Sequence, residues 1–181
     1  MNITEYIIEI KKIVDPNLIK KIIPLAKHKI KENLHVSKGI NKNVRDVKGY
    51  NLNLDTPTNL FYWNLIKQEI ERLYNYYKIK FPQMTSYKIN QIDLLKYSIG
   101  GKYEVHTDHF TNSSRHLSVI MNLNDDYEGG DLIFTDQKEK EIKRLKLEKG
   151  SIVFFPSNFM YPHSIQPVTK GTRYSIVAWL Q

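Results

Sequence analysis

The stretch YKINQIDLLKYSIGGKYEVHTD, residues 87–108, decides how we interpret the fold of this sequence. Apolar and polar side chains alternate along it, and a period of two residues is typical of β-strands. The pair Gly100-Gly101 interrupts the alternation and predicts a turn. We therefore expect two strands, Tyr87–Ser98 and Tyr103–Asp108, on either side of these glycines.

The same pattern continues to the end of the sequence. Turn signals such as Asn124-Asp125-Asp126 and Gly129-Gly130 separate further short β-rich runs. With the first two, these runs are expected to make about eight strands: His116–Leu123, Asp131–Thr135, Ile142–Leu147, Ser151–Phe155, His163–Val168 and Arg173–Leu180. Short strands at this spacing predict an antiparallel sandwich or barrel, and a jelly roll (a double-stranded β-helix) is its natural closed form.

Helical patterns precede the strands. An apolar run, Tyr6–Val14, suits a strand, and Asp15-Pro16 then supplies an N-cap and a proline for the first turn of a helix. This helix is expected to span residues 16–33, bent or broken at Pro24. Residues 35–57 are polar and rich in asparagine, which predicts a long loop.

A second helix is expected to begin with Thr58 as its cap. Apolar side chains recur along it at steps of three and four residues, and we expect this face to pack against a sheet: Tyr62, Ile66, Ile70, Leu73 and Tyr77. The fold class is thus mainly β with supporting helices, a jelly-roll core with N-terminal helices packed on one sheet. We expect one domain over residues 1–181, with helices and loop in 1–86 and the core in 87–181.

The composition narrows the classes of function. The chain has 181 residues, 41% of them hydrophobic, which is enough for one folded domain, and no cysteine. Disulfides, thiolate metal sites and cysteine nucleophiles are therefore excluded, and any metal must be bound by His, Asp, Glu and water. The sequence shows no apolar run of membrane-spanning length and no signal peptide, so we expect a soluble, cytoplasmic protein. The net charge of +8 would suit a polyanion, but the lysines are scattered, and nucleic-acid binding is not expected as the chief role.

His106 and Asp108 are candidate metal ligands. Residues i and i+2 of a strand point to the same face, so these two side chains are expected to project together. His163 follows in a strand that would lie beside the first in a jelly roll. Two imidazoles and one carboxylate on a β-scaffold make the facial triad of non-haem Fe(II) oxygenases, which leaves three coordination positions open. Three other histidines have no partner at ligand spacing, and we interpret them as surface or structural residues: His28, His35 and His116.

Arg173 and Ser175 supply a candidate anion site. They are expected to share one face of a strand, and Arg173 comes ten residues after His163. A buried guanidinium with a hydroxyl beside it suits a carboxylate through charge-assisted, bidentate hydrogen bonds. An arginine at this distance after a candidate ligand favours that role over a surface ion pair.

Five segments of the sequence resemble, in order, the Fe(II)/2-oxoglutarate-dependent dioxygenases, and within them the prolyl 4-hydroxylase-like branch. They cover nearly half of the chain: KYSIGGKYEVHTD at 96–108, YEGGDL at 127–132, GSIVFFP at 150–156, PHSIQPV at 162–168 and GTRYS at 171–175. The first ninety residues resemble the family only loosely, by two helices ahead of the core.

The resemblance implies specific roles. His106, Asp108 and His163 match the Fe(II) ligands, and Arg173 matches the residue that binds the C5 carboxylate of the cosubstrate 2-oxoglutarate. Further cosubstrate contacts are implied for two residues, Tyr97 and Ser175. The implied reaction couples oxidative decarboxylation of 2-oxoglutarate to hydroxylation of a C–H bond, with ascorbate as reductant. The sequence departs from some relatives at Asn122, where they carry a cosubstrate-binding tyrosine.

The resemblance also implies a peptide or protein substrate, with peptidyl proline as the first candidate. Four residues are candidates for the substrate pocket: Trp179, Phe110, Tyr127 and Arg45. Phe110 and Tyr127 could stack on a proline ring, whereas Trp179 could equally be core packing. Three alternatives stay open: the same chemistry on a free amino acid or other small molecule, a catalytically inactive jelly-roll binding module, and oxidative demethylation of nucleic acid, for which the sequence shows no base-reading motif.

Overall fold

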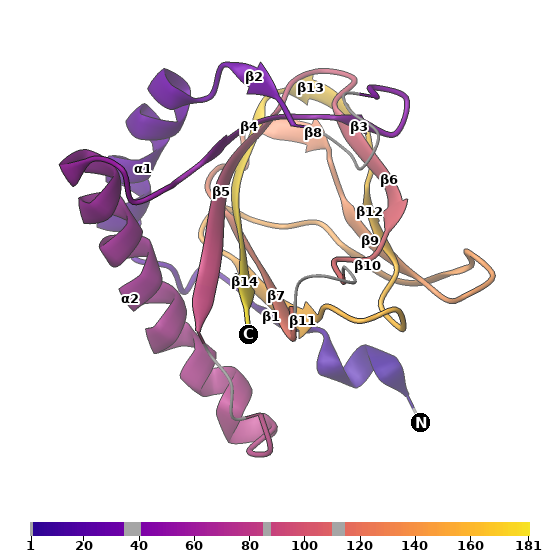
Figure 1. Cartoon of the computed structure of the whole chain (residues 1–181). Helices are drawn as coiled ribbons and strands as arrows, with labels where there is room; N and C mark the ends of the chain where they lie inside the picture. Colours follow the sequence, from indigo (N-terminus) through magenta and orange to yellow (C-terminus); the bar gives the residue numbers. More distant parts are fainter. Residues whose placement is uncertain (1, 35–40, 85–87, 110–114) are drawn as a thin grey trace.

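The computed structural model describes residues 2–34, 41–84, 88–109 and 115–181 (Figure 1). Within these ranges lie two long helices, α1 (Pro16–Lys29) and α2 (Pro57–Lys80), and a short 3-10 helix, η1 (Ile3–Tyr6). No helix in this part of the chain combines the length and the hydropathy needed to cross a membrane. Most of the remaining secondary structure is β-strand.

The larger sheet has seven antiparallel strands in the order β1-β11-β7-β14-β5-β4-β2. In that order the strands span Ile8–Ile10, Ile152–Pro156, Leu117–Asn122, Arg173–Leu180, Ile89–Tyr97, Lys48–Asn51 and Glu32–Asn33. The central strand β14 pairs with β5 on one side and with β7 on the other. Its position buries almost every one of its side chains.

The smaller sheet has five antiparallel strands in the order β10-β9-β12-β6-β3. In that order they span Glu141–Leu145, Leu132–Thr135, His163–Ile165, Lys102–His106 and Arg45–Asp46. Two further strands, β8 (Tyr127–Gly129) and β13 (Val168–Gly171), form a separate pair. The two antiparallel sheets, with the helices beside one of them, confirm the expected double-stranded β-helix fold (Figure 1).

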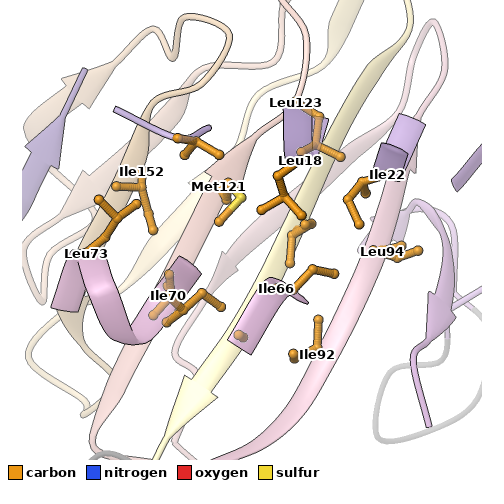
Figure 2. Packing of buried hydrophobic residues seen from close by; sticks show 14 of the residues in the cluster. Leu18, Ile22, Ile66, Ile70, Leu73, Ile92, Leu94, Met121, Leu123 and Ile152 are labelled. Atoms are coloured by element: carbon orange, nitrogen blue, oxygen red, sulfur yellow. The ribbon is translucent and has the colours of Figure 1, made fainter. Parts of the chain in front are cut away.

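Two hydrophobic clusters stabilise this arrangement, one on each face of the larger sheet. Alternation along β5 divides its side chains: Leu94 joins the cluster under the helices, and Leu95 joins the cluster between the sheets. Figure 2 shows the first cluster, where Ile66 and Ile70 of α2 lie against the sheet near Met121. The expected stripe on α2 therefore does pack against a sheet. The second cluster lies between the two sheets, and several of its side chains, such as Leu95 and Tyr97, line the cavity described below.

The helix ends differ from the sequence-based expectation. Helix α1 ends at Lys29, before the expected end at residue 33, and it runs through Pro24 without a break. Burial of Ile22, Leu25 and Ala26 on the turns around Pro24 holds the helix together despite the missing N–H.

Helix α2 begins one residue before the cap that we expected. Thr56, and not Thr58, is its N-cap, because Pro57 occupies the first helical position and the Thr56 hydroxyl accepts from Asn59 N at 3.1 Å.

Several expected segments also differ. The loop expected at 35–57 contains β3 and β4, which pair with β6 and β5; residues 35–40 lie outside the described part of the chain. Both strands are polar and short, and β3 lies at a sheet edge, so they show no hydrophobic alternation that a sequence pattern could detect. The strand expected at Tyr6–Val14 is reduced to β1, since η1 covers its start. Strands β8 and β13 were not expected.

Candidate functional site

The structure brings together the three residues that the sequence nominated as metal ligands. Strands β6 and β12 are neighbours, and His106 and His163 form a cross-strand pair with ring centroids 4.3 Å apart. Asp108 follows the end of β6, and its two carboxylate oxygens lie 3.7 Å from the Nε2 atoms of His106 and His163. One donor atom from each of the three residues lies within 4.8 Å of the others.

Backbone carbonyls orient both imidazoles. His106 Nδ1 lies 2.8 Å from the Glu104 carbonyl oxygen, and His163 Nδ1 lies 3.1 Å from that of Tyr161. Because a carbonyl oxygen only accepts, each Nδ1 must carry the proton, and each Nε2 presents a lone pair toward the shared centre. This tautomer is the one that binds a metal through Nε2.

The carboxylate is oriented and kept charged in the same way. The Ser118 hydroxyl donates to Asp108 Oδ2 at 2.6 Å, and Ser157 Oγ lies 2.8 Å from Ser118 Oγ. Burial acts to raise the pKa of Asp108, but His163, His106 and the Ser118 hydrogen bond outweigh it and hold that pKa below its ordinary value. Burial, together with His163, lowers the pKa of His106. At neutral pH the site therefore offers a neutral His106 imidazole and an ionised Asp108 carboxylate.

This donor set fits Fe(II). Two imidazole nitrogens from adjacent strands and one carboxylate oxygen just beyond the end of β6 match the donor set of non-haem iron sites, in which further positions stay open for other ligands. No thiolate stands nearby, since the sequence contains no cysteine. The residues present are thus suited to hold the metal that the sequence resemblance implied.

The three candidate ligands His106, Asp108 and His163, called the metal cluster below, line a cavity of about 110 Å³ between the two sheets. Arg173 lines it and is 1% exposed, with its guanidinium 5.2 Å from the Tyr97 ring centroid. Its Nε donates to Asn122, but its Nη1 and Nη2 have no hydrogen-bond partner in the described part of the chain. The buried hydroxyl of Ser175, which lines the same cavity, is also without a partner there. A buried cation beside unpaired donors is unfavourable until an anion joins it, so this end of the cavity fits a carboxylate.

The other predicted residues are placed as follows. Trp179 and Arg45 line the cavity, Arg45 with its guanidinium 4.6 Å from the Tyr103 ring centroid. Tyr127 does not line it; this side chain lies behind Arg173, with its hydroxyl 3.4 Å from Asn122 Oδ1. Phe110 lies outside the described residues, as does His35. The side chains of His28 and His116 are exposed and stand apart from the metal cluster.

Sequence reasoning missed several residues of the cavity wall. Gln91 and Asp93 continue the alternation that places Tyr97 in the cavity, so the period of two could have found them. Tyr103 stacks on His106 at 3.5 Å, although strict alternation would separate these two residues. A β-bulge explains the contact, because β6 has one more residue than β12 between the paired positions.

Arg115 is the fourth missed residue of this wall. Its guanidinium lies 3.7 Å from the Trp179 ring centroid and donates to the Gln91 side chain. No local sequence signal marked it as a cavity residue, since its place in the wall depends on contacts with Trp179 and Gln91, which lie on other strands.

Comparison with known families identifies the class. The sequence model of the 2OG-Fe(II) oxygenase superfamily matches residues 92–181, which is half of the chain and includes all three clustered residues and Arg173. The chain belongs to this superfamily. The implied Fe(II) and 2-oxoglutarate agree with the donor set and with the unpaired guanidinium.

Curated relatives are hydroxylases. A PKHD-type hydroxylase of Gloeothece citriformis is 32% identical over 100 residues, which are 52% of this chain and 44% of that protein. Human prolyl 3-hydroxylase 2 is 36% identical over 66 residues, 36% of this chain and 9% of that protein. The chain spans less than half the length of the curated relatives it matches.

Solved structures share the fold over nearly the whole chain. A Pseudomonas putida prolyl-4-hydroxylase superimposes with a TM-score of 0.78 at 15% identity, covering 97% of this chain and 92% of that one. A Trichoplax adhaerens prolyl hydroxylase in complex with a hypoxia inducible factor peptide fragment gives 0.74 at 18% identity, covering 98% and 84%. Because sequence identity is low, these matches establish the fold.

Proposed function

We propose that this chain is an Fe(II)- and 2-oxoglutarate-dependent dioxygenase that hydroxylates a C–H bond, with peptidyl proline as its first candidate substrate. One observation supports this most strongly. A buried arginine, Arg173, places two unpaired NH₂ groups, Nη1 and Nη2, at the same cavity that His106, Asp108 and His163 line. An iron site needs no such arginine unless a dicarboxylate must bind beside the metal.

Each residue has a role in this proposal. His106, Asp108 and His163 hold Fe(II), and Arg173 with Ser175 binds the C5 carboxylate of 2-oxoglutarate. The buried Tyr97 supports the guanidinium from below. Bound Fe(II) supplies dioxygen activation, with 2-oxoglutarate as the two-electron reductant that becomes succinate and carbon dioxide. The protein side chains contribute coordination, orientation and exclusion of water, and none is required to transfer a proton.

The choice of substrate rests on the relatives and on the cavity wall. The relatives described above carry the names of hydroxylases, and prolyl hydroxylases are prominent among them. Trp179 and Arg115 both line the cavity, with the planar guanidinium 3.7 Å from the indole centroid, and planar groups of this kind in the wall suit contact with a proline ring. Arg45 stays a candidate substrate contact. We expect Phe110 to act there as well, and Tyr127 is better explained as support for Arg173.

Succinate formation tests the proposal. The purified chain with Fe(II), 2-oxoglutarate and ascorbate should release succinate, and a chelator should abolish the release. His106→Ala should lose the activity, whereas His28→Ala, a matched change at an exposed histidine far from the cluster, should keep it. Absence of turnover in the intact chain would instead support an inactive binding module.

The same succinate assay with different added substrates distinguishes the remaining alternatives. Proline-containing peptides should stimulate succinate release above the uncoupled rate and gain one oxygen atom by mass spectrometry. Stimulation by free amino acids and not by peptides would point to a small-molecule oxygenase. Stimulation by methylated nucleic acid, with salt-sensitive binding, would point to demethylation.

Three further expectations belong to this proposal. Ascorbate should sustain turnover by keeping iron reduced, which a time course with and without ascorbate tests. Residues 1–181 should unfold as one cooperative domain in calorimetry. A cytoplasmic location stays a prediction, and cell fractionation tests it.

A further inference from the structure

The buried Arg173 guanidinium contacts a second buried polar side chain, that of Asn122. Asn122 lies at the end of β7, is 0% exposed, and pairs in the sheet with Ser175 on β14. Its Oδ1 accepts a hydrogen bond from Arg173 Nε at 3.3 Å. This is the position at which the sequence departs from relatives that carry a tyrosine.

The orientation of the Asn122 carboxamide is fixed. Its Nδ2 donates to two carbonyl oxygens, that of Asn124 at 2.6 Å and that of Leu147 at 3.0 Å. Turning the amide over would place its oxygen against both carbonyls and its NH₂ against the Arg173 N–H, so all three of these contacts would be repulsive. Oδ1 must therefore face Arg173.

Two more residues close the space behind the guanidinium. Tyr127 places its hydroxyl 3.4 Å from Asn122 Oδ1. Gly130 has a φ of +68°, and a Cβ built there would lie 3.1 Å from Arg173 Cδ and 3.2 Å from the Tyr127 ring. The Arg173 side chain is thus closely packed beside the Asn122 amide, the Tyr127 ring and the backbone of Gly130.

We propose that Asn122 is a positioning residue for cosubstrate binding: it engages Arg173 Nε and so directs Nη1 and Nη2 at the distal carboxylate of 2-oxoglutarate. The inference rests on the proposed function and extends it. Asn122 is not among the residues that line the cavity, so it acts through Arg173 and not by touching the cosubstrate.

Binding measurements with two ligands test the inference. Calorimetry on the full chain loaded with Mn(II), which does not turn over, compares 2-oxoglutarate with oxalate, a metal chelator that has no distal carboxylate. Asn122→Ala should raise the dissociation constant of 2-oxoglutarate by about tenfold to 100-fold, the range for one hydrogen bond to a charged group. Oxalate affinity should stay within about twofold, because that ligand does not reach Arg173.

A matched control separates positioning from general destabilisation. Asn59 is also a 0% exposed asparagine with three side-chain hydrogen bonds, but it lies at the start of α2 on the far face of the larger sheet. Asn59→Ala should lower the melting temperature and leave both affinities unchanged. Asn122→Ser retains a polar group and serves as the second variant if Asn122→Ala does not fold.

The outcomes distinguish the two proposals. Loss of 2-oxoglutarate affinity with intact oxalate affinity in the Asn122 variants supports the inference. Wild-type 2-oxoglutarate affinity in those variants, or equal losses for both ligands, overturns the inference and leaves the proposed function standing. Failure of the wild-type, Mn(II)-loaded chain to bind 2-oxoglutarate at all overturns both.

Discussion

Replacing Arg173 by methionine should make the ligand-free protein more stable while it removes cosubstrate binding. The reason is that Nη1 and Nη2 are buried without partners among the described residues. Each such group is expected to cost about 1–3 kcal/mol, so relieving both gains about 4 kcal/mol. Methionine has a similar length and is flexible enough to fill the space.

The interactions that Arg173→Met removes contribute less to the free energy of unfolding than this gain. The variant loses the hydrogen bond from Nε to Asn122 and the contact of the guanidinium with the Tyr97 ring. The hydrogen bond, whose donor is a charged group, contributes about 2 kcal/mol, and the ring contact contributes about 1 kcal/mol. The net effect is a stabilisation of about 1 kcal/mol, which for a domain of this size raises the melting temperature by roughly 2–4 °C.

Thermal unfolding followed by circular dichroism measures both parts of the prediction. Without ligands, Arg173→Met should melt above the wild type. With Mn(II) and 2-oxoglutarate at 100 times its dissociation constant, the wild type should gain about 2.7 kcal/mol beyond the contribution of the metal, whereas the variant should gain little more than the metal contribution. Its affinity for 2-oxoglutarate should fall by about 100-fold or more.

An exposed arginine provides the control. Arg144 pairs with Glu141 and Asp131 at the surface, so Arg144→Met should change the free energy of unfolding by no more than about 1 kcal/mol and leave 2-oxoglutarate binding intact. A ligand-free Arg173→Met protein that melts below the wild type would show that the guanidinium is already satisfied. The argument for a carboxylate site would then be refuted.

Three other predictions concern Gly130 beside Arg173, the buried Ile66 of α2 and the surface carboxylate of Asp136. Gly130→Ala should weaken 2-oxoglutarate binding because a Cβ would press on Arg173, whereas Gly100→Ala has the same left-handed strain (φ +82°) with nothing within 4 Å and should only lower stability; calorimetry compares the two. Ile66→Ala should lower the free energy of unfolding in urea by about 2–5 kcal/mol, because the side chain is 0% exposed between α2 and the sheet. Two backbone N–H groups donate to the Asp136 carboxylate and lower its pKa, so NMR should find it below 3.8. The stability that this interaction contributes is present above the ordinary pKa of the carboxyl group and is lost as the pH falls through the lowered pKa. Asp136→Asn should therefore reduce the fall in the free energy of unfolding at acid pH.

Short-range patterns predicted the strands that are buried on one or both faces. The run Arg173–Leu180 forms β14 with the expected bounds, because an apolar strand flanked by turn residues has few other stable solutions. Strands β3 and β4 were assigned to a loop, since short polar strands obtain their structure from a partner and not from their own sequence. Their existence depends on β6 and β5, which lie far away along the chain.

In the candidate site, too, the sequence predicted contacts between residues that are close along the chain but not those that depend on tertiary packing. His106 and Asp108 are close in sequence and could be paired from the strand period alone, whereas the contact of Tyr103 with His106 required a bulge that no pattern announced. Arg115 was invisible as a cavity residue because its role depends on packing against Trp179. Tyr127 remains a candidate by its place in the motif, although it does not line the cavity and its hydroxyl lies 3.4 Å from Asn122 Oδ1; neither fact could be inferred from the sequence.

The sequence by itself determined the chemistry of this protein: a chain with no cysteine, two histidines and an aspartate at ligand spacing, and an arginine ten residues beyond. Those choices are local, because residue type sets which atoms can donate and strand period sets which side chains share a face. Only the tertiary structure decided which donors remain without a partner. Burial of Arg173 against Asn122, and the absence of any anion beside it in the described part of the chain, result from how β14 packs between β5 and β7. That property belongs to the fold, since a side chain lacks a partner only relative to everything packed around it.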